Sequence, residues 1–207
     1  MTTKELVALE KSLLLQLPGL AVKGSLMFLP PATQILRGIS FEGSSFDKTS
    51  FSVTMFVTLL CVPERYLHLS FANRVRHKGG GDRWTAEMPD LVEQLGIALE
   101  AQAMPFLSPV QSLLDFVELA RSRSASGNLQ TLRAIAFALA RAGQTSQAIG
   151  ALDQLSDRID LKVAWQREIA DQAGALRAKL VADPAEGQRQ LETWEAETIK
   201  NLGLEVT

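Results

Sequence analysis

The chain changes from a strand-like to a helix-like pattern of hydrophobic positions near its middle. Between residues 51 and 62 every odd-numbered position is apolar, from Phe51 to Cys61, whereas several even-numbered positions are polar. This alternation is typical of a strand that has one face in the core. Alternating segments at 22–29, 35–41 and 66–75 predict three further strands. Because the connections between these segments are short, we expect neighbouring strands to be antiparallel.

The remainder of the chain has a helical period. Residues 4–17 carry leucines on one helical face, and from Pro89 onward apolar residues recur every three or four positions. Helix starts are predicted at Ser108–Pro109 and at Asp183–Pro184, where an N-cap residue precedes a proline. The sequence therefore predicts an α+β fold: an N-terminal helix, an antiparallel meander of about four strands, and an all-helical C-terminal half packed on or beside the sheet.

The domain organisation is expected to follow this change of pattern. The segment Ser122–Asn128 is small, polar and turn-prone, which is typical of a linker. We expect a sheet region over residues 1–121 and a helical region over residues 128–207. The apolar content of the helices favours one continuous globular unit with a shared core over two separate small cores.

Charge and cysteine content narrow the class of protein. The 21 basic and 23 acidic residues give a formal net charge of −2, which disfavours general nucleic-acid binding. Cys61 is the single cysteine, so the chain cannot form an internal disulfide or a thiolate metal cluster, and a reducing compartment fits it best. The start of the chain is amphipathic and no apolar run approaches the ~18–20 residues of a membrane span. We therefore expect a cytoplasmic protein that does not enter a membrane.

One segment of the helical half resembles a known repeat. Residues 138–149 are similar to the turn of a tetratricopeptide hairpin, with Gly143 ending one helix and the small Ala148 five positions later. A repeat of ~34 residues would place another such glycine near Arg177, where there is none. The segment is therefore interpreted as one isolated helical hairpin, and the resemblance implies protein binding rather than catalysis.

A short polar segment, residues 74–84, separates the two patterns and supplies the candidate partner-binding residues. Arginine and tryptophan are enriched at the energetic centres of protein interfaces. The alternative is a solvated loop whose tryptophan is in the core. The candidate residues are Arg74, Arg76, His77, Lys78, Asp82, Arg83 and Trp84.

The same segment contains a glycine triplet, Gly79–Gly81, which suggests an alternative function. Glycine backbones expose N–H groups to anions, so a phosphorylated or anionic small molecule is a possible ligand. The triplet lacks the Gly-Lys-Ser/Thr ending of a P-loop and the spacing of a dinucleotide fold. It is therefore more typical of a flexible turn.

Residues suited to catalysis are few. The two histidines, His68 and His77, are too few for a three-histidine metal site. His68 shares a predicted strand face with Tyr66 and Ser70, but neighbours on a strand seldom have the geometry of a catalytic pair. Carboxylates such as Glu64 and Glu87 are near predicted element ends, where capping explains them. We expect no catalytic residue, no metal and no cofactor.

Four segments, 35–42, 61–63, 68–71 and 80–84, carry a resemblance that extends over much of the first half of the chain. Together they resemble small bacterial α+β proteins, some of which are immunity partners of secreted toxins. The resemblance implies a cytoplasmic protein that blocks a partner toxin or enzyme by stoichiometric binding, and it assigns no catalytic residue. A helical scaffold or adaptor is a further alternative.

Overall fold

The computed structural model describes residues 1–123 and 128–204, and most of the predicted linker at 122–128 lies outside them. The described chain forms two compact units. Unit 1 comprises Met1–Ala32, Leu36–Thr58 and Phe71–Val110; unit 2 comprises Thr33–Ile35, Leu59–Ser70 and the chain from Gln111 onward. The segment Leu59–Ser70, which follows the longest strand, thus folds with the C-terminal helices.

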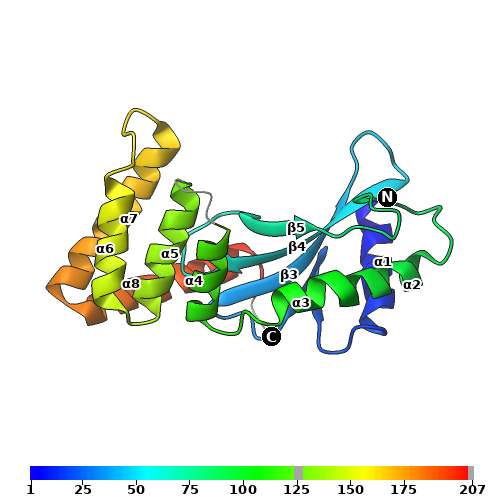
Figure 1. Ribbon diagram of the computed structural model, residues 1–207, viewed down its shortest axis with the longest axis horizontal. Coiled ribbons are helices and arrows are strands. Elements are labelled where there is room, and N and C mark those ends of the chain that lie inside the picture. The colour runs from blue at the N-terminus through cyan, green and yellow to red at the C-terminus, as the bar shows by residue number, and fades with distance from the viewer. Residues whose placement is uncertain (124–127, 205–207) are drawn as a thin grey trace. The chain divides into compact units, whose positions relative to one another are not determined.

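Unit 1 begins with helix α1 (Thr3–Leu14), shown in blue in Figure 1. A capping box fixes its start: the Thr2 side chain accepts a hydrogen bond from the Glu5 backbone N–H, and the Glu5 carboxylate accepts one from the Thr2 N–H. Leu6, Leu9 and Leu13 form its buried face. The helix therefore lies where the leucine spacing predicts it.

A six-stranded antiparallel sheet forms the body of unit 1. Strands β1 to β5 follow one another as a meander, and β6 pairs with β4 beyond β5. Both β5 and β6 therefore lie along the same edge of β4. The strands are β1 (Ala21–Lys23), β2 (Leu26–Leu29), β3 (Ile35–Gly43), β4 (Ser50–Leu59), β5 (Phe71–Arg74) and β6 (Arg83–Thr85).

Three of the predicted strands differ from the observed ones. The strand predicted over 51–62 ends at Leu59. The segment at 22–29 is a tight hairpin, because Gly24 has a φ of 61° and reverses the chain between β1 and β2. The prediction of a strand over 66–75 is wrong for residues 66–70, since the pairing with β4 begins at Phe71. An apolar–polar alternation without ladder partners does not make a strand, and residues 66–70 instead belong to unit 2.

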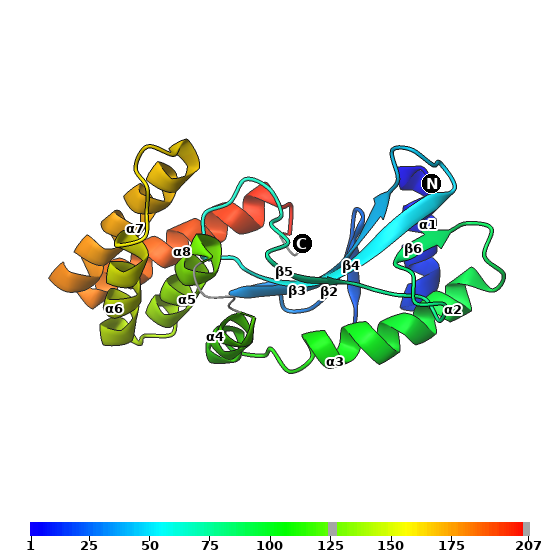
Figure 2. The same cartoon turned by 45° about the horizontal axis from the view of Figure 1, so that its top comes forward.

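A continuous helical segment follows the sheet and completes unit 1. It runs as α2 (Leu91–Ala98), a π-helical turn η1 (Leu99–Ala103) and α3 (Met104–Leu107), and Figures 1 and 2 show it as one long green helix beside the sheet strands. Leu95, Leu99 and Leu107 are fully buried. The apolar residues whose spacing predicted this helix thus form its buried side.

Unit 2 contains five helices: α4 (Leu113–Ser122), α5 (Leu129–Arg141), α6 (Thr145–Ser156), α7 (Ala164–Ala182) and α8 (Pro184–Asn201). Helix α8 begins at the predicted Asp183–Pro184 signal, where Asp183 accepts a hydrogen bond from the Ala185 N–H at 2.9 Å. The helix start predicted at Ser108 is wrong. Ser108 ends α3, and Ser112 caps α4 through a reciprocal pair of hydrogen bonds with Asp115.

The predicted helical hairpin is formed by α5 and α6. Gly143 has a φ of 75°, the left-handed conformation that ends a helix, and Ala148 is fully buried between closely packed helices. The predicted α+β class, with an N-terminal helix, an antiparallel meander and a helical C-terminal half, is confirmed. In the part of the chain described, no helix has both the length and the apolar character needed to cross a membrane.

Candidate functional site

The predicted partner-binding segment spans the end of β5, the loop that joins β5 to β6, and the start of β6 in unit 1. The base of the loop is fixed to the sheet. The Val75 N–H donates to the Val53 carbonyl at 2.9 Å, which extends the pairing of β5 by one bond. The Val75 carbonyl in turn accepts the indole N–H of Trp84 at 3.1 Å. A hydrogen bond between Trp84 and Val75 therefore links the two ends of the loop.

Trp84 supports this loop from the inside. Its side chain has no exposed surface, and Phe51 of β4 is its cross-strand neighbour. A buried indole with its N–H satisfied contributes several kcal/mol to the core, on the order of 3–5. Trp84 was predicted to contact a partner, but in this structure it offers no surface for such a contact.

Gln102, on η1, forms two hydrogen bonds with the backbone of Arg76, the next residue of the loop. Its side-chain oxygen accepts the Arg76 N–H at 3.0 Å, and its side-chain nitrogen donates to the Arg76 carbonyl at 2.7 Å. The amide thus pairs with Arg76 as a neighbouring strand would. A π-helical turn shifts the register of side chains on a helix, and such turns are frequent at functional sites.

His77 organises the glycine triplet. Its Nδ1 accepts the Gly79 N–H at 3.0 Å, its carbonyl accepts the Gly80 N–H at 2.8 Å, and its N–H donates to the Gly81 carbonyl at 2.9 Å. The ring also meets Trp84 edge-on, with centroids 5.7 Å apart. A Cβ on Gly81 would lie 2.5 Å from the His77 Nε2, so a side chain at this position would displace the ring.

These contacts argue against the alternative in which the glycine triplet binds an anion. Two of the three glycine N–H groups already donate within the loop, to the ring and to the carbonyl of His77. They are therefore not directed outward as a phosphate cradle requires. Gly79 and Gly81 are explained by the close packing of the turn on His77, and Gly80 by its φ of 85°.

A groove of about 590 Å³ lies between this loop and the α2–η1 helix. One wall is formed by Arg76, His77 and Lys78, and the other by one face of the helix, with residues Gln94, Ile97, Ala98, Ala101 and Gln102. Its volume is in the range of ligand-binding clefts. Ile97 is 61% exposed and supplies the largest apolar side chain of this lining.

The other charged candidates line a second, smaller hollow. Arg74, Asp82 and Arg83 border a space of about 300 Å³ together with Glu42 and Ser52. Arg74 donates to the Ser52 hydroxyl and is 3.7 Å from the Glu42 carboxylate. The structure thus separates the candidates: Arg76, His77 and Lys78 lie at one groove, and the mixed-charge group around Arg74 lies at another.

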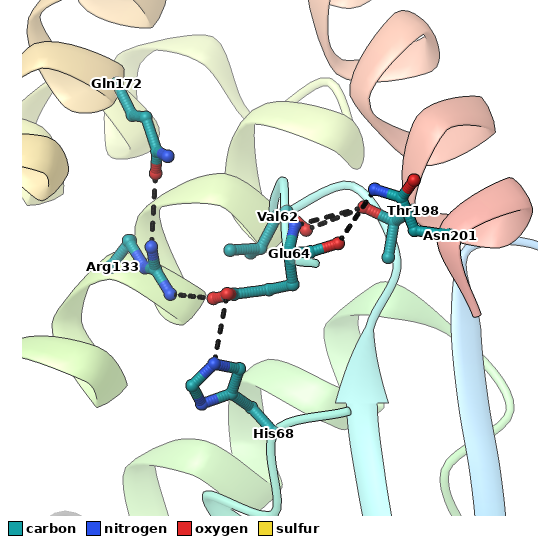
Figure 3. Close-up of polar contacts among 7 residues, drawn as sticks. All are labelled: Val62, Glu64, His68, Arg133, Gln172, Thr198 and Asn201. Carbon is teal, nitrogen blue, oxygen red and sulfur yellow. Dashed lines mark hydrogen bonds and ion pairs between the residues drawn. The ribbon is translucent and has the colours of Figure 1, made fainter. Parts of the chain in front are cut away.

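Unit 2 has a buried polar cluster that the sequence analysis did not predict (Figure 3). The Arg133 guanidinium on α5 donates to the Glu64 carboxylate and, at 3.1 Å, to the Gln172 side chain on α7. The Arg133 side chain is 9% exposed and that of Glu64 is 16% exposed. Among the residues that the structure describes, the Arg133 Nε has no hydrogen-bond partner.

The backbone around Glu64 is fixed by α8. The Thr198 hydroxyl donates to the Val62 carbonyl at 3.1 Å, and the Asn201 amide donates to the Glu64 carbonyl at 3.2 Å (Figure 3). The segment Leu59–Ser70 is thereby tied directly to α5 and α8, and Arg133 links it in turn to α7 through Gln172. We interpret the cluster as structural, because its opposite charges compensate one another.

His68 belongs to this cluster and not to a strand face. Its Nε2 is 3.2 Å from the Glu64 carboxylate, and its side chain is 52% exposed. Because residues 66–70 form no strand, the predicted alignment of His68 with Tyr66 and Ser70 is wrong. Glu64, predicted to act as a cap, is instead the acceptor shared by Arg133 and His68.

Two further buried groups stand out by their chemistry. Glu10 on α1 has no exposed surface and no hydrogen-bond partner among the described residues, and its burial raises the pKa of the carboxyl to about 7. Burial also raises the pKa of the Cys61 thiol to about 12. The thiol is therefore protonated and unreactive, as predicted for a small core residue.

Sequence reasoning missed Gln102, Ile97, Ala101 and Arg133. An isoleucine among polar residues on the outer side of a helix was the available signal for Ile97. Nothing in the local sequence indicates that Gln102 reaches Arg76 or that Arg133 reaches Glu64, because these pairs are 26 and 69 residues apart. Such contacts depend on the tertiary fold.

Within residues 1–123 and 128–204, no group of three or more His, Cys, Asp or Glu side chains is placed to hold a metal ion. Comparison of the chain with protein-family models, with curated proteins and with solved structures finds no match. The function must therefore be inferred from the site itself.

Proposed function

We propose that this protein acts by binding another protein, as a cytoplasmic stoichiometric inhibitor of the immunity type. The observation that carries the proposal is the pair of exposed cations, Arg76 and Lys78, on a rigidly held loop beside an exposed apolar helix face. Neither has an ion-pair partner among the residues described. Their charges are therefore available to a partner.

The rigidity of the loop supports recognition. Gln102 fixes the backbone of Arg76, and His77 fixes the following turn. A surface that is ordered before association loses less conformational entropy when it binds. Exposed charges increase the rate of encounter with an oppositely charged partner, whereas apolar contacts at the centre supply most of the affinity.

The inhibitory role and the cytoplasmic location rest on the sequence. The resemblance to toxin-immunity proteins supports the former, and a single cysteine, buried as a thiol, supports the latter. Blocking an active site requires a fixed surface and no catalytic group of its own. We therefore propose that the protein is not an enzyme and that it uses no cofactor.

The helical scaffold is the second candidate function, because unit 2 has a groove of its own. Leu114 on α4, Leu139 on α5 and Gln147 on α6 border a space of about 290 Å³. Leu114 is 47% exposed. This surface would accept a partner without any contribution from the β5–β6 loop.

Affinity capture from the native host tests the proposal. The tagged protein is compared with R76E/K78E and with a control, R158E/K162E, which makes the same change of charge at exposed positions of unit 2. We expect the wild type and the control to retain one stoichiometric partner and the loop variant to lose it. The purified partner should then lose its activity on addition of one equivalent of wild-type protein.

Two outcomes contradict the proposal. If a partner is captured equally by all three proteins, the loop is not the binding site, and loss of the partner on changing Leu114 to aspartate would favour the scaffold. If the folded wild-type protein retains no partner but is stabilised by nucleotides or phosphate in a thermal-shift assay, the anionic small-molecule alternative replaces protein binding.

A further inference from the structure

The groove between the β5–β6 loop and the α2–η1 helix has a chemistry that restricts what it accepts. Its floor is apolar, with Ile97, Ala98 and Ala101 on one helical face. Its rim carries Arg76 and Lys78, and its lining includes no acidic side chain. The complement of this surface is an apolar group flanked by negative charge.

The groove is kept open by its own construction. Ala98 and Ala101 have small side chains, so the helix wall recedes where a longer side chain would fill the space. Gln102 is turned to the Arg76 backbone and holds the opposite wall at a fixed separation. The depth of the groove is therefore a property of the folded loop and helix.

The volume indicates how much of a partner enters. At about 590 Å³ the groove lies within the range of clefts that bind whole ligands. It therefore suits a short peptide segment with apolar side chains. Recognition of this kind, with apolar anchors along one face of a segment laid in a groove, is a recurring mode of protein recognition.

We propose that this groove binds a short acidic segment of the partner protein, with leucine-like side chains on the Ile97–Ala101 face and carboxylates at Arg76 and Lys78. This inference rests on the proposed protein-binding function and names the chemistry of the partner. It makes Ala101 a residue that determines which segments fit. A basic segment is rejected because its charges would face the two cations.

Fluorescence anisotropy with three labelled nonapeptides tests the inference. The first contains aspartate, glutamate and leucine; the second has serine in place of leucine; the third has lysine in place of the acids. We expect the first to bind at least roughly tenfold more tightly than the other two, and its affinity to fall as salt is raised. Backbone amide signals of Lys78, Ile97 and Ala101 should shift on its addition.

Two variants localise the binding. A101E puts a carboxylate into the groove and should weaken the acidic leucine peptide by roughly tenfold or more. A8E makes the same substitution at an exposed alanine of α1 in the same unit and should leave the affinity unchanged. Thermal melting tests whether both variants are folded. If A101E does not fold, the amide shifts of the wild-type protein still test where the peptide binds.

The inference is overturned if the three peptides bind alike, if the shifted signals lie outside the groove, or if an excess of inorganic phosphate displaces the leucine peptide completely. Its failure is distinct from failure of the proposed function. A partner captured in the host through Arg76 and Lys78, without any effect of A101E, would retain protein binding and reject the acidic segment as its ligand.

Discussion

The two units of this protein differ in how their charged side chains are paired. Of the ion pairs between described residues, one, Glu42–Arg74 at 3.7 Å, is in unit 1, and all the others are in unit 2. Unit 2 also buries Glu64 against Arg133. Unit 1 buries Glu10 with no partner among the described residues and leaves Arg76 and Lys78 exposed.

The difference separates charges that serve folding from charges that are available for binding. In the buried Glu64–Arg133 pair, the attraction between the two charges offsets the cost of removing them from water. These charges are therefore not available to a ligand. The loop cations of unit 1 remain hydrated and unpaired by described residues. We therefore expect the loop cations of unit 1 to serve recognition and the buried Glu64–Arg133 pair of unit 2 to serve folding.

The largest predicted effect is the loss of the buried pair. Replacing Arg133 with methionine leaves the Glu64 carboxylate partly buried without its main cation, and we expect the free energy of unfolding to fall by about 3–5 kcal/mol. Urea denaturation measures the change. The control R121M removes an exposed pair with Glu118 and should cost less than about 1 kcal/mol. Equal losses in the two variants would show that burial of the pair is unimportant.

Glu10 provides a pH-dependent test of the unpaired carboxyl in unit 1. Its pKa is raised to about 7 in the folded state, so the folded protein holds a proton that the unfolded chain has lost between about pH 4.5 and 7. The contribution of Glu10 to the free energy of unfolding should therefore be highest below this range and decrease as the pH rises through it. The shift corresponds to at most about 3 kcal/mol.

The variant E10Q cannot ionise at this position, so it should lack this decrease. We expect it to match the wild type near pH 5 and to exceed it by up to about 3 kcal/mol near pH 8. The control E93Q changes an exposed glutamate on α2 and should follow the wild type at both pH values. A difference between E10Q and the wild type that did not change with pH would refute the assignment.

Gly81 tests whether the loop is held by His77. In G81A the new methyl group meets the imidazole at 2.5 Å, and displacement of the ring should lower the stability by about 1–3 kcal/mol. The double variant H77A/G81A removes the clash and should recover part of the loss. G174A, where a helical glycine of α7 has open space around it, should instead be neutral or slightly stabilising in thermal melts.

The smallest effect is predicted for His68. Its pair with Glu64 is half exposed, and exposed pairs contribute about 0–1 kcal/mol. H68A should therefore change the midpoint of thermal unfolding little, and it should leave partner capture unchanged. A loss of partner binding in H68A would move the recognition surface to unit 2 and contradict the comparison.

The sequence by itself determined the α+β class, the N-terminal helix, the longest strand and the helix start at Asp183, because each depends on local periodicity or on a cap and its proline. It also indicated the loop at 74–84 through its charges and glycines. The division into sheet and helical regions at 1–121 and 128–207 stays a prediction.

Only the tertiary structure decided which charged residues meet. It buried Trp84, left residues 66–70 outside any strand, placed Gln102 against Arg76, and joined Glu64 to Arg133 across 69 residues. The physical reason is that periodicity reports which side of an element is apolar, whereas hydrogen bonds between distant residues depend on the final position of every element that carries them.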